Sequence, residues 1–433
     1  MENQDWLSRT QTALWHPCTQ MKQMEAMPPL PIARGEGPWL IDYDGRRYLD
    51  AISSWWVNLF GHANPRINAA IIDQLNRIEH VILAGCTHAP VIELSERLAR
   101  LTGLGHAFYG SDGASATEIA LKMSFHYWRN SGKPGKTTFV SLKNGYHGET
   151  LGALSVTDVA IFKDTYAPLL RHSHQAMSPD WRLAEAGESA EDYALRAADD
   201  LGRYLSRHAD VTAAVIVEPL VQGAAGMAMY HPAYLIKVRE LCDRHGVHLI
   251  ADEIAVGFGR TGTLFACEQA GIRPDFMCLS KGITGGYLPL SVVLTRDRIY
   301  AAFYDDSTAR GFLHSHSYTG NPLACRAALA VLDIFEQDRV IDKNRDASLI
   351  MRRIFSEVAA HNRVRNFRQA GMILAFDVID APSGFAADFH HRALSHGVFL
   401  RPIGNTVYFM PPYILGPEEM RLLADTTLAL LEP

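Results

Sequence analysis

Two short apolar segments, each followed by a polar side chain with useful chemistry, constrain this chain more than any other feature. Residues 247–251 lead into Asp252, and residues 276–279 lead through Ser280 into Lys281. Both runs are short and apolar, which is typical of buried strands. Ligands of open α/β sheets bind at the carboxyl ends of the strands. The two runs therefore predict one crevice that receives the carboxylate of Asp252 and the amine of Lys281.

Strand-like and helix-like segments alternate between residues 86 and 330, which favours an α/β fold with a mostly parallel, doubly wound sheet. The N-terminal 65 residues are rich in loops and contain a hairpin over residues 39–50 that turns at Asp44-Gly45. The last hundred residues predict an α+β unit. Further strands are expected at residues 107–109, 138–142, 213–217, 291–295 (the last one antiparallel), 372–378, 398–402 and 407–410, and helices at residues 65–82, 322–337 and 341–360.

Composition limits the class of protein. The chain has 433 residues, enough for two or three domains, and its 48% hydrophobic and 20% charged residues suit a globular enzyme. A net charge of −6 gives no basic footprint for nucleic acid or membrane. No apolar run reaches the ~18 residues of a membrane span, and no signal peptide is visible. The six cysteines form no CxxC pair, so we expect a reduced, cytoplasmic protein.

The pairing of an Asp and a Lys at neighbouring strand ends suits pyridoxal phosphate (PLP) chemistry. A lysine forms a Schiff base with the aldehyde of this cofactor, and an Asp partners its ring nitrogen. Asp252 and Ile254 lie two residues apart on an extended segment and so face the same way, which lets Ile254 pack on the ring. Alone, Asp252 would more commonly be a cap or turn residue, and Lys281 a solvated surface amine.

Two other segments suit a flat, phosphate-bearing ligand. The small-residue loop over residues 110–118 opens a helix, and helix N-termini favour anions. A capping box beginning at Ser115 explains the same residues. Tyr146 follows the strand at 138–142 and either stacks on a cofactor or serves as a turn residue.

Substrate-binding groups are suggested by an aromatic pair and an arginine. Trp55 and Trp56 are adjacent, so they cannot both point into one core from a regular strand; either one lines a cavity or both pack on the hairpin. Arg401, on a predicted strand, suits bidentate binding of a carboxylate, with a surface ion pair as the alternative. The histidine pairs 172/174, 314/316 and 390/391 lack a matching carboxylate or cysteine set, so no metal site is expected.

These motifs together resemble the signature of the class III aminotransferases, PLP enzymes of fold type I. That resemblance implies a large domain at residues 66–330 with a mostly parallel, seven-stranded sheet, and a smaller α+β domain built from residues 1–65 and 331–433. The matching motifs are Asp252-Glu253-Ile254, residues 257–262, Ser280-Lys281-Gly282, Tyr146-His147-Gly148, Glu218-Pro219 and residues 319–322.

The resemblance also implies roles for the residues around the cofactor. Lys281 would hold PLP and transfer the proton of the reaction, and Asp252 would bind the pyridine nitrogen. Tyr146 and Ile254 would lie on opposite faces of the ring.

A further set of residues would bind the phosphate of the cofactor. Gly113 and Ala114 would donate backbone N–H groups to it. Ser317 would reach the phosphate across the interface of a homodimer, which places the active site between two subunits.

Within the class, three segments resemble the branch that converts 8-amino-7-oxononanoate to 7,8-diaminononanoate in biotin biosynthesis, with S-adenosylmethionine as amino donor and a ping-pong mechanism. The three segments are Trp15-His16-Pro17, Ser53–Trp56 and Arg401-Pro402.

The substrate contacts implied by this resemblance come from Trp55, Tyr146, Lys281, Arg401 and Ser315. The alternatives are another class III enzyme, of the ω-amine:pyruvate or aminomutase type or with lysine as donor, and a PLP-binding protein without activity.

Three positions depart from the pattern of that branch. Cys18 stands where a Tyr is usual, and a thiol is a shorter and weaker hydrogen-bond partner than a phenol. Ser315-His316 replaces Gly-Pro, which changes the loop before Ser317. Glu149 replaces an Asp, so a carboxylate is kept on a longer arm.

Overall fold

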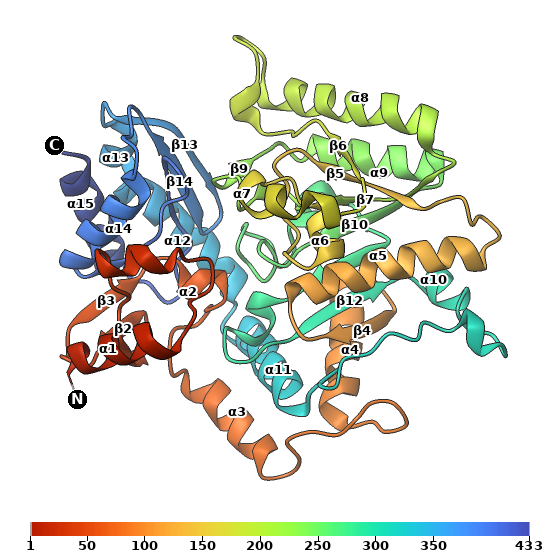
Figure 1. Ribbon diagram of the computed structural model, residues 1–433, viewed down its shortest axis with the longest axis horizontal. Helices are drawn as coiled ribbons and strands as arrows, with labels where there is room; N and C mark the ends of the chain where they lie inside the picture. The colour runs from red at the N-terminus through yellow and green to blue at the C-terminus, as the bar shows by residue number, and fades with distance from the viewer. Residues whose placement is uncertain (1, 433) are drawn as a thin grey trace.

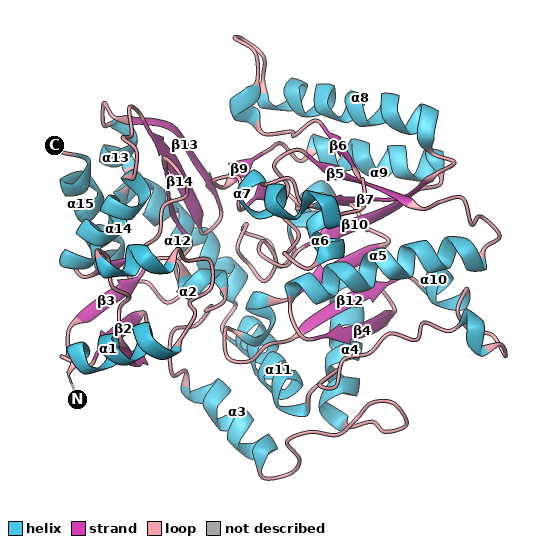
Figure 2. Ribbon diagram, viewed as in Figure 1, coloured by secondary structure: helices cyan, strands magenta, loops and turns pink. Residues whose placement is uncertain are grey.

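A seven-stranded sheet forms the centre of the larger part of the molecule (Figures 1 and 2). The structure is a computed structural model and describes residues 2–432. The strand order is β4-β12-β11-β10-β7-β5-β6, and only β12 runs antiparallel to its neighbours. The mostly parallel sheet is therefore confirmed. Its strands are β4 (His106–Gly110), β5 (Thr138–Leu142), β6 (His174–Ala176), β7 (Thr212–Val217), β10 (His248–Asp252), β11 (Phe276–Leu279) and β12 (Ser291–Thr295).

Helices cover both faces of this sheet, because its central strands β7, β10, β11 and β12 are buried at every position. Ala214 and Ile216 of β7 pack with α5 (Gly113–Asn130) on one face. The alternate residues Val215 and Val217 pack with α8 (Ala190–His208) and α9 (Ala233–His245) on the other. Successive side chains of a strand point to opposite faces, so this pattern requires two buried faces. The larger part also contains α4 (Ala89–Thr102), which packs beside β4, and α11 (Pro322–Gln337), which packs against α4 and α3 (Pro65–Leu75).

The two ends of the chain form one smaller unit, seen in Figure 1 as red and blue segments side by side. β15 (Val398–Phe399) pairs in parallel with β3 (Arg47–Asp50), which joins the N- and C-terminal segments in one sheet. The division at residues 65/66 and 330/331 stays a prediction, since α11 runs through residue 330. The remaining elements of this unit are β1 (Ile32–Glu36), β2 (Trp39–Asp42), β13 (Val364–Ala370), β14 (Ile373–Val378), β16 (Thr406–Phe409), α1 (Asn3–Ala13), α12 (Val340–Ile354), α13 (Ser356–Ala360), α14 (Phe385–Ser395) and α15 (Pro417–Leu431).

Two helices differ from the sequence prediction. The helix expected to reach residue 82 ends at Leu75, because the Gln74 side chain donates to the Ile78 carbonyl at 2.9 Å and closes a turn there. The helix expected over residues 341–360 is broken at the fully buried Phe355, which separates α12 from α13.

The strand expected at residues 398–402 ends at Phe399, where the Leu400 carbonyl bonds the His390 ring instead of a neighbouring strand. The Asp44-Gly45 hairpin is confirmed, with Gly45 at a φ of 85°. The short elements are α2 (Ser53–Trp56), α6 (Leu151–Val156), α7 (Ala160–Lys163), α10 (Asp297–Ala301), β8 (Val221–Gln222), β9 (Ala228–Met229) and the 3₁₀ helices at Met21–Glu25, Asp164–Leu169, Trp181–Leu183, Ala266–Ala270, Lys281–Thr284 and Thr308–Arg310. Within residues 2–432, no helix has the length and apolar character needed to cross a bilayer.

Candidate active site

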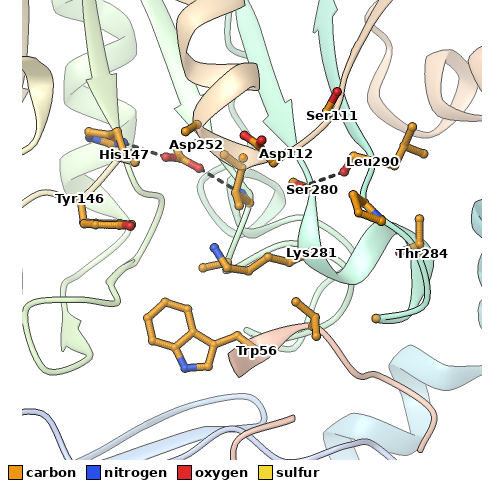
Figure 3. A pocket seen from close by; sticks show the side chains of 18 of the residues that line it. Trp56, Ser111, Asp112, Tyr146, His147, Asp252, Ser280, Lys281, Thr284 and Leu290 are labelled. Atoms are coloured by element: carbon orange, nitrogen blue, oxygen red, sulfur yellow. Dashed lines mark hydrogen bonds and ion pairs between the residues drawn. The ribbon is translucent and has the colours of Figure 1, made fainter. Parts of the chain in front are cut away.

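A cavity of 760 Å³ lies at the carboxyl ends of β5, β7, β10 and β11 (Figure 3). The residues that follow these strands line it, together with the start of α5 and a segment of the smaller unit. The two apolar runs therefore bring Asp252 and Lys281 into one cavity, as expected. The lining side chains that carry chemistry are Trp56, Ser111, Asp112, Tyr146, His147, Glu149, Glu218, Asp252, Ser280, Lys281 and Thr284.

Asp252 is a buried carboxylate held in a fixed direction. It is the last residue of β10, and its Oδ2 lies 2.7 Å from Nδ1 of His147. Its Oδ1 accepts the N–H of Ile254 at 3.1 Å. His147 is itself buried, and its Nε2 has no polar partner within residues 2–432. The pair can therefore present an oriented carboxylate to a ligand N–H without first rearranging.

Lys281 lies between Asp252 and Trp56 in the cavity (Figure 3). It follows β11 with a φ of 47°, and its Nζ lies 5.5 Å from the centroid of the Trp56 ring. The side chain opens to the cavity, but protein surrounds it on its other sides. Burial lowers the pKa of Lys281, and the charges of Asp252 and Glu218 partly oppose this shift. A lowered pKa favours the neutral amine, which is the nucleophilic and proton-accepting form.

Glu218 follows β7 and is a second buried carboxyl group in the cavity wall. Its two oxygens accept the backbone N–H groups of Tyr146 and Gly223, each at 2.9 Å. Burial raises the pKa of Glu218 to about 7; His147 and the two N–H groups oppose the shift, and Asp252 adds to it. The cavity thus holds a group that exchanges its proton near neutral pH. Sequence reasoning noted Glu218 only within a motif, although it ends a buried strand just as Asp252 does.

The N-terminus of α5 also opens into the cavity. Asp112 caps the helix by accepting the Ser115 N–H at 2.8 Å, so the cap lies three residues before the capping box considered at Ser115. Gly113 and Ala114 stand in the first turn, where backbone N–H groups have no partner within the helix. A Cβ on Gly113 would lie 3.1 Å from Cγ2 of Ile254, so a side chain there would crowd this wall. Such a terminus is suited to an anion such as phosphate.

Tyr146 and Ile254 both line the cavity. The Tyr146 hydroxyl donates to Oε1 of Glu149 at 2.8 Å, and burial raises the pKa of this phenol. One of the three departures from the branch pattern, Glu149, therefore binds the hydroxyl of Tyr146 directly.

The tryptophan pair lies on a left-handed turn. All four residues of Ser53–Trp56 have positive φ, from 45° to 72°. Left-handed backbone costs L-residues roughly 1–2 kcal/mol each, so the turn is strained. Trp56 is buried in the cavity wall, whereas Trp55 is 45% exposed and stacks on the Arg401 guanidinium at 5.1 Å. The structure therefore places Trp56, and not Trp55, among the lining residues; the substrate contacts expected of Trp55 and Arg401 stay predictions.

The segment that carries Ser315 and Ser317 lies outside the cavity of its own chain. Both serines are exposed, and the segment approaches the cavity only where His316 Nδ1 lies 3.5 Å from the Ser111 hydroxyl. His314 and His316 contact each other at 3.2 Å, with Lys122 against His314. Among the described residues, no three side chains of His, Cys, Asp or Glu gather as metal ligands.

Comparison with known proteins identifies the family. The family model "Aminotransferase class-III" matches residues 20–429. This chain belongs to the class III aminotransferases. The aminotransferase is 45% identical over 415 residues to the adenosylmethionine-8-amino-7-oxononanoate aminotransferase of Helicobacter pylori, which covers 94% of this chain and 93% of that relative. The enzyme of the same name from Geobacter sulfurreducens is 41% identical over 434 residues, with 97% and 95% covered.

Solved structures of the class agree with this aminotransferase along its length. The adenosylmethionine-8-amino-7-oxononanoate aminotransferase of Methanocaldococcus jannaschii superposes with a TM-score of 0.94 at 35% identity, over 100% of this chain and 99% of that one. An omega transaminase mutant of Pseudomonas jessenii reaches a TM-score of 0.94 at 28% identity, with 98% of each chain covered. The shared fold therefore extends across enzymes of different names, so residues of the site must decide the substrate.

PLP, the cofactor of this class, fits the groups that the aminotransferase brings together. A buried amine, a buried and oriented carboxylate and a helix N-terminus face one cavity, and these match the aldehyde, ring nitrogen and phosphate of PLP. Tyr146 and Ile254 supply aromatic and aliphatic surface for a flat ring.

Proposed function

We propose that this chain transfers an amino group to 8-amino-7-oxononanoate and yields 7,8-diaminononanoate, with S-adenosylmethionine as the donor, in biotin biosynthesis. The observation that carries the proposal is its full-length similarity to relatives named for this reaction. The chemistry of the cavity supports it. Bound PLP would withdraw electrons from the substrate carbon that loses or gains a proton.

The residues of the cavity would hold the cofactor from several sides. Asp252, fixed by His147, would accept the ring N–H. Gly113 and Ala114 would bind the phosphate with their N–H groups and the dipole of α5. Tyr146 and Ile254 would flank the ring.

Lys281 would carry the proton of the reaction. Its lowered pKa favours an amine that takes a proton from the substrate carbon bearing the amino group and later returns it. The indole of Trp56 at 5.5 Å stabilises the protonated form of that amine through its ring face. One residue can therefore act as base and then as acid within each half of a ping-pong cycle.

Substrate would enter beside the tryptophan pair. Arg401, stacked on Trp55, would bind the carboxylate of the ketone, and Trp55 would cover its aliphatic chain. The hydroxyl of Ser315 is a further proposed contact. Both amino donor and ketone would use this one cavity.

The active enzyme would be a cytoplasmic homodimer in which Ser317 of one subunit completes the phosphate site of the other. Ser317 lies in an exposed segment with the exposed apolar side chains Leu313 and Tyr318. Such side chains suit burial against a second copy.

Product analysis tests the reaction. Purified enzyme is incubated with PLP, 8-amino-7-oxononanoate and one donor at a time, and the diamine is detected by mass spectrometry. The proposal predicts 7,8-diaminononanoate with S-adenosylmethionine. Formation with lysine alone would change the donor. A parallel incubation replaces the ketone with pyruvate; amination of pyruvate, with no diamine from any donor in the first incubation, would contradict the proposal.

A further inference from the structure

The strained turn at Ser53–Trp56 has no local cause. None of its four residues is Gly, Asn or Asp, the residue types that enter left-handed backbone most readily. Its ring is closed by Trp56 N–H on the Ile52 carbonyl at 2.8 Å and by Val57 N–H on the Ser53 carbonyl at 3.0 Å. These bonds would form in a right-handed turn as well. Contacts from outside the turn must therefore select its hand.

Asp50 supplies the strongest of these contacts. It is the last residue of β3 and has no exposed surface. Its Oδ1 accepts the Ser54 N–H at 2.9 Å, and its Oδ2 accepts the Ser54 hydroxyl at 2.7 Å. His62 also reaches Oδ2, with its Nε2 at 3.1 Å. One buried carboxylate thus binds both donors of a residue within the left-handed segment.

The other contacts fix the ends of the turn. The Ser53 hydroxyl donates to the Met410 carbonyl at 2.8 Å, and the Trp56 indole N–H donates to the Tyr408 hydroxyl at 3.1 Å. The fully buried Arg260 donates to the carbonyls of Trp56, at 3.4 Å, and Asn58, at 3.1 Å. Asp50 alone of these partners binds the middle of the turn.

The hand of this turn decides which indole meets the cavity. In the left-handed form Trp56 lines the wall over the Lys281 amine, and Trp55 stacks on Arg401 outside it. A right-handed turn would send the same two side chains in other directions. The separation of the Lys281 amine from the stacked pair of Arg401 and Trp55 therefore depends on the left-handed backbone that Asp50 stabilises.

We propose that Asp50 is a positioning residue for substrate selectivity, which holds Ser54 in the left-handed turn and so sets Trp56 over Lys281 and Trp55 against Arg401. The inference rests on the proposed function, because the ligand it concerns is a ketone with an apolar chain and a terminal carboxylate. Asp50 does not line the cavity and would act through the indoles.

The test compares D50N with D42N. Asp42 is a matched control: it is a buried carboxylate of the same small sheet, with hydrogen bonds from Arg46 N–H at 2.8 Å and the Tyr48 hydroxyl at 3.0 Å, and it does not line the cavity. For D50N we expect KM for the carboxylate-bearing ketone to rise at least ~10-fold, equivalent to ~1.4 kcal/mol, with kcat within about threefold. D42N should lower Tm without that rise in KM.

A second readout needs no turnover. Iodide quenching of tryptophan fluorescence is measured on cofactor-free protein. Each variant is measured with and without the added substitution W55F, and the difference in quenching between the two proteins reports the exposure of Trp55. We expect that difference to change in D50N and to stay at the wild-type value in D42N and in S54G, because glycine adopts the left-handed turn without strain.

The proposal would be overturned if D50N loses as much Tm as D42N but keeps the quenching and the KM of the wild type. Should D50N fail to fold, S54A removes the hydroxyl bond alone and should give the same changes at smaller size; unchanged values would again overturn it. If the enzyme does not use 8-amino-7-oxononanoate, the proposed function fails, and quenching still decides whether Asp50 holds the turn.

Discussion

Lys281 and Glu218 have opposite pKa shifts with one physical cause. Burial disfavours charge on either group, so it lowers the pKa of the Lys281 amine and raises the pKa of the Glu218 carboxyl to about 7. The pKa values of both groups are thereby brought closer to neutral pH, and a catalytic group transfers protons most efficiently when its pKa lies near the working pH.

Removing the Lys281 amine should abolish the aminotransferase activity. We expect K281A to bind PLP without the visible absorbance band of lysine-bound cofactor and to lose more than ~10³-fold in kcat, the scale of a missing general base. K136A is the control: Lys136 is also buried, but it donates to the Thr212 carbonyl at 2.9 Å, away from the cavity. K136A should be less stable and keep the band. A K281A protein with the wild-type band would contradict the assignment.

The raised pKa of Glu218 should make the stability of the protein depend on pH in a defined range. Its pKa rises from 4.5 to about 7 on folding, so between these values the native protein binds a proton that the unfolded chain does not. Rising pH in that window therefore lowers the free energy of unfolding. E218Q cannot titrate, so the stability of the wild type relative to E218Q should fall from pH 4.5 to 7 and stay level above. Chemical denaturation at several pH values measures it; a difference independent of pH would refute the shift.

At the scale of the element, the Asp112 cap at the start of α5 should affect both the stability of the protein and its affinity for PLP. D112A should cost about 1 kcal/mol of stability through loss of the cap and should weaken PLP binding, because the first turn frays where Gly113 and Ala114 face the cavity. D112N removes the charge and keeps a capping side chain, so it should bind PLP more tightly than D112A. S189A, at the cap of α8, should lose similar stability with unchanged PLP affinity. Equal PLP affinity in D112A and D112N, by titration calorimetry, would reject the link.

The sequence predicts those elements whose geometry is local. The strands before Asp252 and Lys281 follow from short apolar runs, and parallel strand ends necessarily meet at one edge of the sheet. The turn at Ser53–Trp56 could not be predicted, because serine and tryptophan give no signal for left-handed backbone. Its partners Tyr408 and Met410 lie about 350 residues away in the chain. The choice of Trp56 over Trp55 for the cavity wall depends on that turn.

The roles of Glu218 and His147 also could not be predicted from the sequence, because they depend on contacts between distant segments. Glu218 and His147 stand in recognisable motifs, but their roles depend on distances to Tyr146, Gly223 and Asp252 that only the folded sheet creates. Ser317 is different again, since its proposed partner lies in another subunit.

At the scale of the whole molecule, the proposed homodimer can be tested by mixing variants. A heterodimer of K281A and S317A subunits has one Lys281, in the chain that lacks the Ser317 hydroxyl. If Ser317 acts across the interface, that site receives an intact Ser317 and should bind PLP with wild-type affinity. If Ser317 acts in its own chain, affinity should be weakened about fivefold as in the S317A homodimer, the size of one hydrogen bond. Differently tagged subunits allow the heterodimer to be purified for this titration.

The amino-group transfer itself is tested most directly by separating its two halves. Enzyme in the PLP form is mixed with S-adenosylmethionine alone, and the visible band of the cofactor is followed in a single turnover. We predict that the band is lost, and that adding 8-amino-7-oxononanoate restores it with one equivalent of 7,8-diaminononanoate per site. A band that S-adenosylmethionine leaves unchanged, or that pyruvate restores and the oxononanoate does not, would contradict the account.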